Sequence, residues 1–234
     1  MSKTSITFLS LGPGDPELLT LKAVRTLREA DIIMVPATRT DDGQLKSRAT
    51  DIISEWCDHN RLTFYELPML NDRQAVSVVY DRMFEDIVRC HAEGRRVAVA
   101  VEGDVSIYAS VHYVMDRLTE AGLAVEQLAG IPSFIAAAAD AGLSLVSQRQ
   151  RLTILPGDAD TDTLSHLLQQ GHVVVVMKLS RCQQAVKDFL HDHPDTRCHY
   201  LENIGTAEAF HATEREVILS RKMPYFSLCI LYPS

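Results

Sequence analysis

Cysteine is scarce in this sequence, and no cysteines stand at the spacing of a metal site. The five cysteines, at positions 57, 90, 182, 198 and 229, are odd in number and never form a Cys-x-x-Cys pair. This pattern argues against a disulfide framework and against a zinc ribbon. It is typical of a protein in a reducing compartment, so we expect a cytoplasmic location and no protein-bound metal.

Long apolar runs and an excess of positive charge are also missing. No stretch approaches the roughly 20 apolar residues of a membrane-spanning helix, and the N-terminal residues lack the features of a signal peptide. The formal net charge is -8, whereas proteins that bind nucleic acid non-specifically usually carry a basic surface. We therefore expect neither a membrane nor a nucleic acid as a partner.

Several familiar catalytic signatures are absent, among them the nucleophile elbow, His-Glu-x-x-His and the kinase motifs. The chain does contain short β-type runs that alternate with amphipathic helical patterns, which predicts an α/β fold with a mostly parallel sheet. The second half alternates less regularly. We expect two α/β lobes with a cleft between them: residues 1–124 with a mostly parallel sheet, and residues 125–234 with a mixed sheet.

The expected boundaries follow from proline, glycine and capping residues. Pro36 should end the second strand, and residues 37–47 should form an exposed loop. Asp15 and Ser106 should cap helices that contain Leu18 to Leu27 and extend to Leu118, respectively. The strands are expected at 6–11, 32–35, 62–67, 97–101, 125–128, 152–155, 172–177, 200–201 and 224–232.

A glycine-rich turn joins the first strand to the first helix, in the sequence Leu-Gly-Pro-Gly-Asp-Pro-Glu. Gly12 and Gly14 allow backbone angles and close approaches that a side chain would block. Ligands of open α/β sheets bind where such turns lie, at the carboxyl ends of strands. A tight, well-capped turn with no ligand explains the same residues, and Glu17 stands where a dinucleotide fingerprint needs its third glycine.

Two further turns strengthen the expectation of a ligand site. Glu102-Gly103-Asp104 follows the clearest buried strand, and Gly130-Ile131-Pro132-Ser133 follows the next one. Glycine turns at several strand ends of one sheet make a shared site for a small ligand more plausible than a single turn does.

These motifs carry a resemblance to a known family. Residues 11–23, Glu102 to Tyr108, Gly130 to Phe134 and Val176 to Lys178 resemble, in order, four turns of the tetrapyrrole methylases. These are class III S-adenosylmethionine-dependent methyltransferases that build corrins and sirohaem. The segments 151–156, 202–206 and 224–228 further resemble the branch that methylates C(20) of precorrin-2 or of cobalt-factor II in cobalamin biosynthesis. Val105 and Ala129 depart from the pattern, which has proline at both positions.

The resemblance implies a cofactor, a substrate and an assembly. S-adenosylmethionine would be the methyl donor, a tetrapyrrole the acceptor, and the chain would form a homodimer. The cofactor-binding residues carried over by position are Pro13, Gly103, Asp104, Ile107, Pro132, Ser133, Met177, Ile204, Ser227 and Leu228. Another tetrapyrrole methylase, a diphthine synthase or a non-enzymatic binding module are the alternatives.

The implied reaction needs little besides alignment, because the meso carbon of precorrin-2 is itself a nucleophile and positioning contributes several kcal/mol. A base to remove the meso proton is an option, and Asp104 is the first candidate, followed by Glu102 and Tyr108. Each of them has a structural explanation as well. The substrate carboxylates predict a few basic contacts, for which the candidates are Arg39, Lys46, Arg48, Arg149, Arg151, Lys178 and Arg181.

Overall fold

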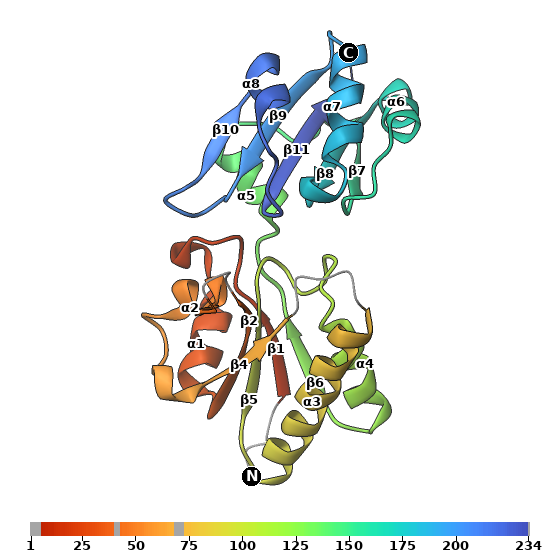
Figure 1. The fold of residues 1–234 in the computed structure, drawn as a ribbon. Helices are drawn as coiled ribbons and strands as arrows, with labels where there is room; N and C mark the ends of the chain where they lie inside the picture. The colour runs from red at the N-terminus through yellow and green to blue at the C-terminus, as the bar shows by residue number, and fades with distance from the viewer. Residues whose placement is uncertain (1–5, 40–42, 68–72, 234) are drawn as a thin grey trace. The chain divides into compact units, whose positions relative to one another are not determined.

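The computed structural model describes residues 6–39, 43–67 and 73–233 (Figure 1). The chain divides into two compact units, residues 1–132 and 133–234. The division falls later than the boundary expected after residue 124. The reason is that strand β6 (Val125–Leu128) pairs in parallel with the first strand, β1 (Ile6–Ser10), and so belongs to the N-terminal unit.

The N-terminal unit is built on a six-stranded sheet with the order β3-β2-β5-β1-β6, in which β4 also pairs with β2. Every described pairing is parallel except that of the short strand β3. The remaining strands are β2 (Ile32–Arg39), β3 (Leu45–Lys46), β4 (Leu62–Glu66) and β5 (Val97–Val101). The expected mostly parallel sheet is therefore confirmed.

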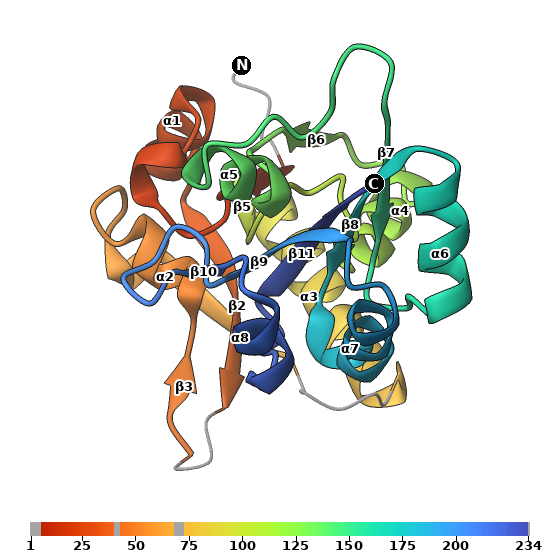
Figure 2. The same ribbon diagram turned by 90° about the horizontal axis from the view of Figure 1, so that it is seen from above.

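Helices cover both faces of this sheet (Figures 1 and 2). Ile6 and Phe8 of β1 pack with α3 (Arg73–Ala92) and α4 (His112–Glu120), whereas Leu9 packs with α1 (Leu21–Glu29) and α2 (Arg48–Ile53). Alternate residues of a strand face opposite sides, so a strand buried on both faces is apolar throughout. None of the described helices is long and apolar enough to span a bilayer.

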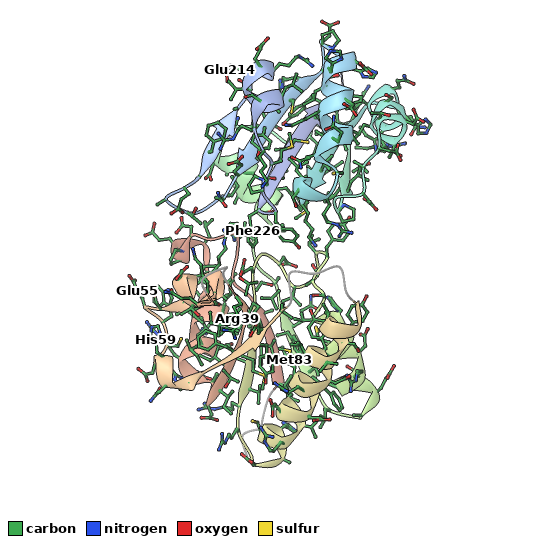
Figure 3. All side chains as sticks on the ribbon, viewed as in Figure 1. Arg39, Glu55, His59, Met83, Glu214 and Phe226 are labelled. Carbon is green, nitrogen blue, oxygen red and sulfur yellow. The ribbon has the colours of Figure 1, made fainter. Side chains whose placement is uncertain are left out.

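Figure 3 shows the side chains of these elements, some of which are buried and others exposed. Met83 of α3 is buried in the core, whereas Glu55 and His59 are exposed beyond α2 and in the short 3-10 helix η2 (His59–Arg61). Arg61 at the end of η2 donates to the carbonyls of Leu27, Arg28 and Ala30 at the C-terminus of α1. These bonds satisfy carbonyl groups that a helix end otherwise leaves without partners.

The first helix differs from the expectation. Asp15 caps as predicted, since its carboxylate accepts a 2.8 Å hydrogen bond from the Glu17 amide, but it starts only the 3-10 helix η1 (Pro16–Leu18). α1 begins anew at Leu21, capped by the Thr20 hydroxyl, which accepts from the Ala23 amide. The continuous helix from Leu18 was therefore wrong, and Leu21 is 80% exposed rather than part of the core.

Strand β2 continues through Pro36, which the sequence predicted as its end. The pairing of β2 with β5 stops at Met34, so the missing amide of Pro36 removes no bond on that side. Beyond it, Thr38 and Arg39 form a hairpin pair with Leu45 and Lys46. Part of the expected exposed loop is thus a strand.

The C-terminal unit contains a five-stranded mixed sheet, as expected, in the order β10-β9-β11-β8-β7. Only β7 and β8 are parallel. The strands are β7 (Arg151–Leu155), β8 (His172–Met177), β9 (Arg197–Glu202), β10 (Phe210–Ala212) and β11 (Ser227–Tyr232), and the helices are α5 (Ser133–Asp140), α6 (Thr161–Gln169), α7 (Gln183–Asp192) and α8 (Arg215–Ser220).

Both faces of β8 are buried in this unit. Val174 and Val176 belong to the cluster that includes residues of α6, α7 and α8. Val173 and Val175 are equally inaccessible but lie outside that cluster, on the opposite face. The helix α5 has its own buried residues, Phe134 and three alanines, and its C-terminal end lies beside Leu201 of β9.

Candidate functional site

The carboxyl ends of β1 and β5 are joined by a reciprocal backbone pair. The Gly12 amide donates to the Gly103 carbonyl at 3.0 Å, and the Gly103 amide donates to the Gly12 carbonyl at 2.7 Å. Both glycines have positive φ angles, 74° and 75°, which side chains rarely adopt. The two predicted glycine turns therefore meet, as the sequence indicated.

This meeting point has a special place in the topology. The connection after β1 leads to α1 on one face of the sheet, and the connection after β5 leads to α4 on the other. Adjacent parallel strands whose connections leave toward opposite faces mark the switch point where α/β sheets bind ligands. The N-terminal candidate site is thus defined by fold topology as well as by glycine.

A buried serine binds the third turn to the other two. The Ser10 hydroxyl donates to the Leu128 carbonyl at 2.7 Å and accepts from the Val105 amide at 2.8 Å. Val105 stands where the family pattern has proline, which has no amide hydrogen to donate. Val105 is fully buried. Val105 therefore holds this turn through a bond that proline would not make.

Asp104 spans the second and third turns. Its Oδ2 accepts from the Gly130 amide at 2.6 Å, and its Oδ1 accepts from the amide and the hydroxyl of Ser106. Burial alone would raise the pKa of Asp104, but the hydrogen bonds from Ser106 and Gly130 outweigh it and hold the pKa below its usual value. Ser106 is therefore not the cap of α4, which begins at His112, and that prediction was wrong.

We expect Asp104→Ala to destabilise the protein by about 2–3 kcal/mol, because the partly buried amide of Gly130 loses a charged acceptor. The stability that Asp104 contributes is present above its unfolded pKa near about 4 and is lost as the pH falls through its lower folded pKa. Urea unfolding of Asp104→Ala and wild type at pH 7 and pH 3 measures both effects. The gap between them should shrink in acid, and an equal gap at both pH values would contradict this role.

Glu102, the other carboxylate of the same turn, has different surroundings. Its Oε2 lies 3.8 Å from Nε of Arg48, the first residue of α2, and its side chain is a quarter exposed. Arg48 Nη2 also approaches the Pro13 carbonyl at 3.4 Å. Burial raises the pKa of Glu102, Arg48 lowers it, and Asp51 raises it further, with a net upward shift.

The other predicted residues of the N-terminal unit lie beside these groups. Pro13, Ile107 and Pro132 are all partly buried, and the Ile107 amide donates to the Asp104 carbonyl at 3.1 Å. Tyr108 has a left-handed backbone, with φ 51°, and is exposed. The structure thus brings Pro13, Gly103, Asp104 and Ile107 to one edge of the sheet.

The C-terminal unit gathers its predicted residues at the start of β11. Leu228 is the register partner of both Met177 and Leu201, and Ser227 is the partner of Glu202. The Asn203 amide donates to the Phe226 carbonyl at 2.9 Å, which places Ile204 next to this group. Ser133, the remaining predicted residue, is the first residue of α5 and is partly buried.

An ion pair between a buried carboxylate and a partly exposed arginine stabilises this group, and the sequence did not point to it. Arg221 donates to both carboxylate oxygens of Glu202, at 2.9 Å and 2.7 Å, and its guanidinium lies 3.8 Å from the centre of the Phe210 ring. The Tyr200 hydroxyl donates to the same carboxylate. Burial alone would raise the pKa of Glu202, but the Arg221 and Tyr200 hydrogen bonds hold it below its usual value.

The seven basic candidates separate by their contacts. Arg39 makes two bonds to Glu66 and one to the Gly43 carbonyl, so its guanidinium already has partners within the unit. Arg48 lies at the site, and Lys178 Nζ lies 5.8 Å from the centre of the Tyr225 ring. Lys46, Arg149, Arg151 and Arg181 are exposed. Arg48 approaches the Pro13 carbonyl and Lys178 directly follows Met177, so both adjoin predicted cofactor residues.

Exposed aromatic residues stand beside Lys178. Tyr225 and Phe226 are in edge contact, with ring centres 5.3 Å apart, and both are more than two-fifths exposed. Phe226 is marked in Figure 3. Lys178 and Asn203 have left-handed backbones, with φ 56° and 48°, so the turns after β8 and β9 share an unusual conformation.

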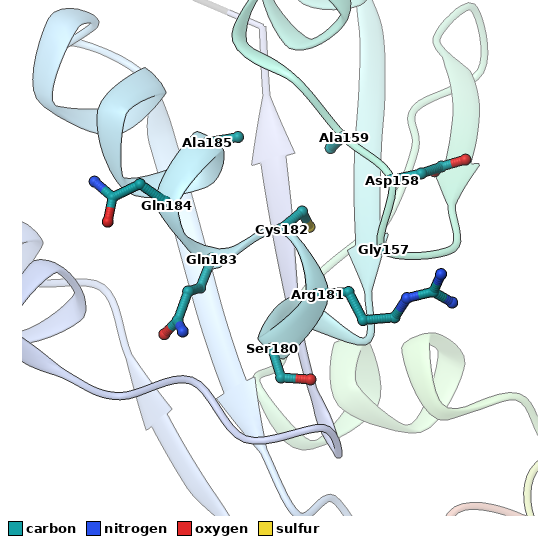
Figure 4. A pocket seen from close by; sticks show the side chains of 9 residues that line it. All are labelled: Gly157, Asp158, Ala159, Ser180, Arg181, Cys182, Gln183, Gln184 and Ala185. Carbon is teal, nitrogen blue, oxygen red and sulfur yellow. The ribbon is translucent and has the colours of Figure 1, made fainter. Parts of the chain in front are cut away.

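A separate open groove lies elsewhere in the C-terminal unit, between the β7–α6 turn and the first turn of α7 (Figure 4). It is lined by Gly157, Arg181 and Cys182 among others, and none of the predicted cofactor residues lines it. Within the described ranges, no cluster of three or more His, Cys, Asp or Glu side chains is arranged to hold a metal ion.

Ser10, Glu202 and Arg221 are the residues that sequence reasoning missed as parts of the site. A serine at the end of an apolar β run is a weak signal that its hydroxyl has a buried partner. The Glu202–Arg221 pair gave no signal, because the two residues are distant in the sequence and only the sheet brings them together.

Comparison with known proteins identifies the family. Residues 5–217 match the model of the Tetrapyrrole (Corrin/Porphyrin) Methylases. The chain is 31% identical over 170 residues to the probable cobalt-precorrin-2 C(20)-methyltransferase of Methanocaldococcus jannaschii, covering 73% of this chain and 70% of that protein. It is 26% identical over 226 residues to the cobalt-precorrin-2 C(20)-methyltransferase of Salmonella typhimurium, covering 95% and 94% of the two chains.

Solved structures share the fold. The crystal structure of a cobalt precorrin-4 methyltransferase superposes with a TM-score of 0.74 at 18% identity, covering 99% of this chain and 95% of the other. The uroporphyrin-III C-methyltransferase of Thermus thermophilus, complexed with S-adenosyl homocysteine, gives 0.65 at 20% identity, covering 97% of both chains. The family match spans both units, and this chain therefore belongs to the tetrapyrrole methylases.

Proposed function

We propose that the protein transfers a methyl group from S-adenosylmethionine to the C(20) meso carbon of precorrin-2 or of its cobalt complex, in corrin-ring biosynthesis. The observation that carries the proposal is the similarity to C(20)-methyltransferases, which reaches 32% identity and in one case extends over 95% of this chain.

The C-terminal sheet adds support. The segments at 202–206 and 224–228, which resemble the C(20) branch, are neighbours in the structure. Ser227 pairs with Glu202, and the Asn203 amide donates to the Phe226 carbonyl. Leu228, in the second of these segments, is the register partner of Met177, which resembles a cofactor contact of the family. The branch-like residues therefore lie at the predicted site rather than on a distant surface.

The N-terminal turns support the proposal because they leave space beside a backbone segment. A Cβ atom built on Gly103 would meet no other atom within 4 Å, so open space lies beside its backbone. A ligand with many polar groups can approach such a backbone closely. We infer that the cofactor is bound by two sets of residues. Those of the N-terminal unit are Pro13, Gly103, Asp104, Ile107 and Pro132, and those of the C-terminal unit are Ser133, Met177, Ile204, Ser227 and Leu228.

Bound S-adenosylmethionine would supply an electrophilic methyl group. The task of these residues is then to orient it toward the acceptor carbon, and alignment of this kind is worth several kcal/mol. Arg48 and Lys178 are suited to bind substrate carboxylates because both adjoin the predicted cofactor residues. The Tyr225 and Phe226 rings offer an apolar surface to a flat macrocycle.

The test is anaerobic incubation of the purified protein with labelled S-adenosylmethionine and either precorrin-2 or cobalt-factor II. Product mass and carbon-13 NMR report how many methyl groups are added and where. One methyl at C(20) supports the proposal, and the faster acceptor identifies the pathway. A methyl at another carbon indicates another branch, and cofactor binding without transfer indicates a diphthine synthase or a non-enzymatic module.

We also propose that the protein is a cytoplasmic homodimer. All five cysteines are free thiols, which suits a reducing compartment. The dimer rests on family resemblance alone. Light scattering behind size exclusion should give about twice the chain mass of 26.1 kDa, and a monomer mass would contradict it.

A further inference from the structure

Two carboxylates flank Gly103, and the structure gives them opposite environments. Asp104 is almost inaccessible, and its two oxygens receive three hydrogen bonds from Ser106 and Gly130. Glu102 is a quarter exposed and is approached by Arg48 at 3.8 Å, which is longer than a direct hydrogen bond. Paired carboxylates in contrasting surroundings are a common basis for assigning acid and base roles.

The position of Glu102 is set by rigid elements. It follows directly on β5, whose five residues are all buried, and it precedes the reciprocal Gly12–Gly103 pair. Arg48, which faces it, begins α2, and the preceding Ser47 caps this helix while its hydroxyl donates to the Pro36 carbonyl at 2.6 Å. The carboxylate therefore lies at the switch point of the sheet, beside the Pro13 loop that we assign to the cofactor.

The charges that act on Glu102 come from one helix. Arg48 and Asp51 both belong to α2, and they act in opposite directions on the pKa of the carboxyl group. Burial is the largest influence and shifts the pKa upward. Asp104 belongs to the same turn but directs its oxygens to Ser106 and Gly130. Glu102 is thus the carboxylate of this turn whose oxygens, among the described residues, are free of backbone donors and whose pKa is shifted upward, as suits a proton acceptor.

We propose that Glu102 is the base that accepts the C(20) proton after methyl transfer, and that Asp104 only positions the turns. The inference rests on the proposed function. The meso carbon attacks the sulfonium methyl, so a C–C bond forms as the S–CH3 bond breaks and S-adenosylhomocysteine leaves. The C(20)–H bond then gives its electron pair back to the macrocycle, and the proton passes to a Glu102 carboxylate oxygen.

Arg48 positions Glu102 in this scheme. A carboxylate in a partly buried site needs a nearby cation to stay ionised while it waits for a proton. At 3.8 Å the guanidinium stabilises the charge without a direct bond to Oε2. Tyr108, the third candidate base, is exposed and so lacks the partial burial that distinguishes Glu102.

The first experiment compares Glu102→Gln with wild type on the acceptor that the protein methylates. General-base catalysis is worth about 100- to 10,000-fold, so kcat should fall at least about 100-fold while the affinity for S-adenosylmethionine, measured by calorimetry, stays unchanged. Glu102→Asp shortens the side chain and so increases the distance that the proton must travel. The kinetic isotope effect on kcat, measured with deuterium at C(20), should therefore be larger for Glu102→Asp than for wild type. Asp104→Asn should chiefly lower stability and cofactor affinity.

The second experiment uses the pH profile of kcat. Asp51 raises the pKa of Glu102, so Asp51→Asn should move the acidic limb to lower pH. Arg48 lowers that pKa, so Arg48→Ala should move the limb to higher pH. A purely structural role for Glu102 would produce neither shift. If Glu102→Gln keeps the wild-type rate and profile, the proposal is overturned while the methyltransferase function stands; if wild type methylates no tetrapyrrole, both fall.

Discussion

Gly130→Ala should destabilise the N-terminal unit by at least about 2–3 kcal/mol and sharply weaken cofactor binding. A Cβ at this position would lie 2.3 Å from the Ser10 Cβ and 3.1 Å from the Gly103 carbonyl oxygen. Ser10 cannot give way easily, because it is buried and hydrogen-bonded to Leu128 and Val105. Overpacking of this kind typically costs about 1–3 kcal/mol and displaces backbone. Chemical unfolding and calorimetric titration with S-adenosylmethionine measure the two effects.

Two control experiments test whether a clash with Ser10 causes the loss of stability. Gly142 has a positive φ of 63°, and no atom lies within 4 Å of a Cβ built on it. Gly142→Ala should therefore cost about 1–2 kcal/mol through backbone strain, without a clash. Ser10→Gly removes the Cβ that the new methyl group at position 130 would strike. The double variant Ser10→Gly/Gly130→Ala should therefore be more stable than the sum of the single effects predicts, by about 1 kcal/mol or more. Strict additivity would rule out the Ser10 contact as the cause.

Arg221→Ala should cost about 3 kcal/mol of stability at neutral pH. It leaves the Glu202 carboxylate, which is only 4% exposed, with the Tyr200 hydroxyl as its donor. Breaking one side of a buried ion pair typically costs about 3–5 kcal/mol, and the partial exposure of Arg221 argues for the lower end. Because Glu202 pairs with Ser227 across the sheet, cofactor affinity should fall as well. Thermal and urea unfolding provide the measurement.

Arg117→Ala is a matched control for this prediction. Arg117 also pairs with a carboxylate, Asp81, and also lies over an aromatic ring, Phe84, but its partner is half exposed. Exposed pairs contribute about 0–1 kcal/mol. Adding Glu202→Gln to Arg221→Ala should recover part of the loss, because a neutral amide is cheaper to bury than a carboxylate. Equal losses for Arg117→Ala and Arg221→Ala would refute the burial argument.

The strands and glycine turns of this fold could be predicted from the sequence because local patterns determine them. The run Val97–Val101 is buried along its whole length, as its composition predicted. Asp15, Gly12 and Gly103 were identified from capping and turn chemistry, and the structure confirms Asp15 as a cap and places the glycines in one backbone pair.

The hydrogen-bond and ion-pair partners of the polar groups could not be predicted, since they depend on how distant strands align. Asp104 was the first choice of base from its place in the turn, but nothing local revealed that Gly130 and Ser106 occupy its oxygens. Ser106 was predicted to cap a helix, but in the structure its hydroxyl donates to the Asp104 carboxylate. The different environment of Glu102 depends on Arg48, which belongs to α2 and lies more than 50 residues earlier in the sequence.

The place of β1 between β5 and β6 in the parallel sheet has a consequence for biosynthesis. Its hydrogen-bonding partners are β5 and β6, whose residues follow some 90 to 120 positions later, as in the pairs Ile6–Val97 and Ile6–Val125. An emerging chain therefore carries this apolar strand without its neighbours until both have left the ribosome. Non-local parallel pairing of this kind is slow and leaves strand edges open to aggregation. We therefore expect the nascent N-terminal unit to be exposed to aggregation until β5 and β6 are available, and we expect β1 to exchange its amide hydrogens most slowly once folding is complete.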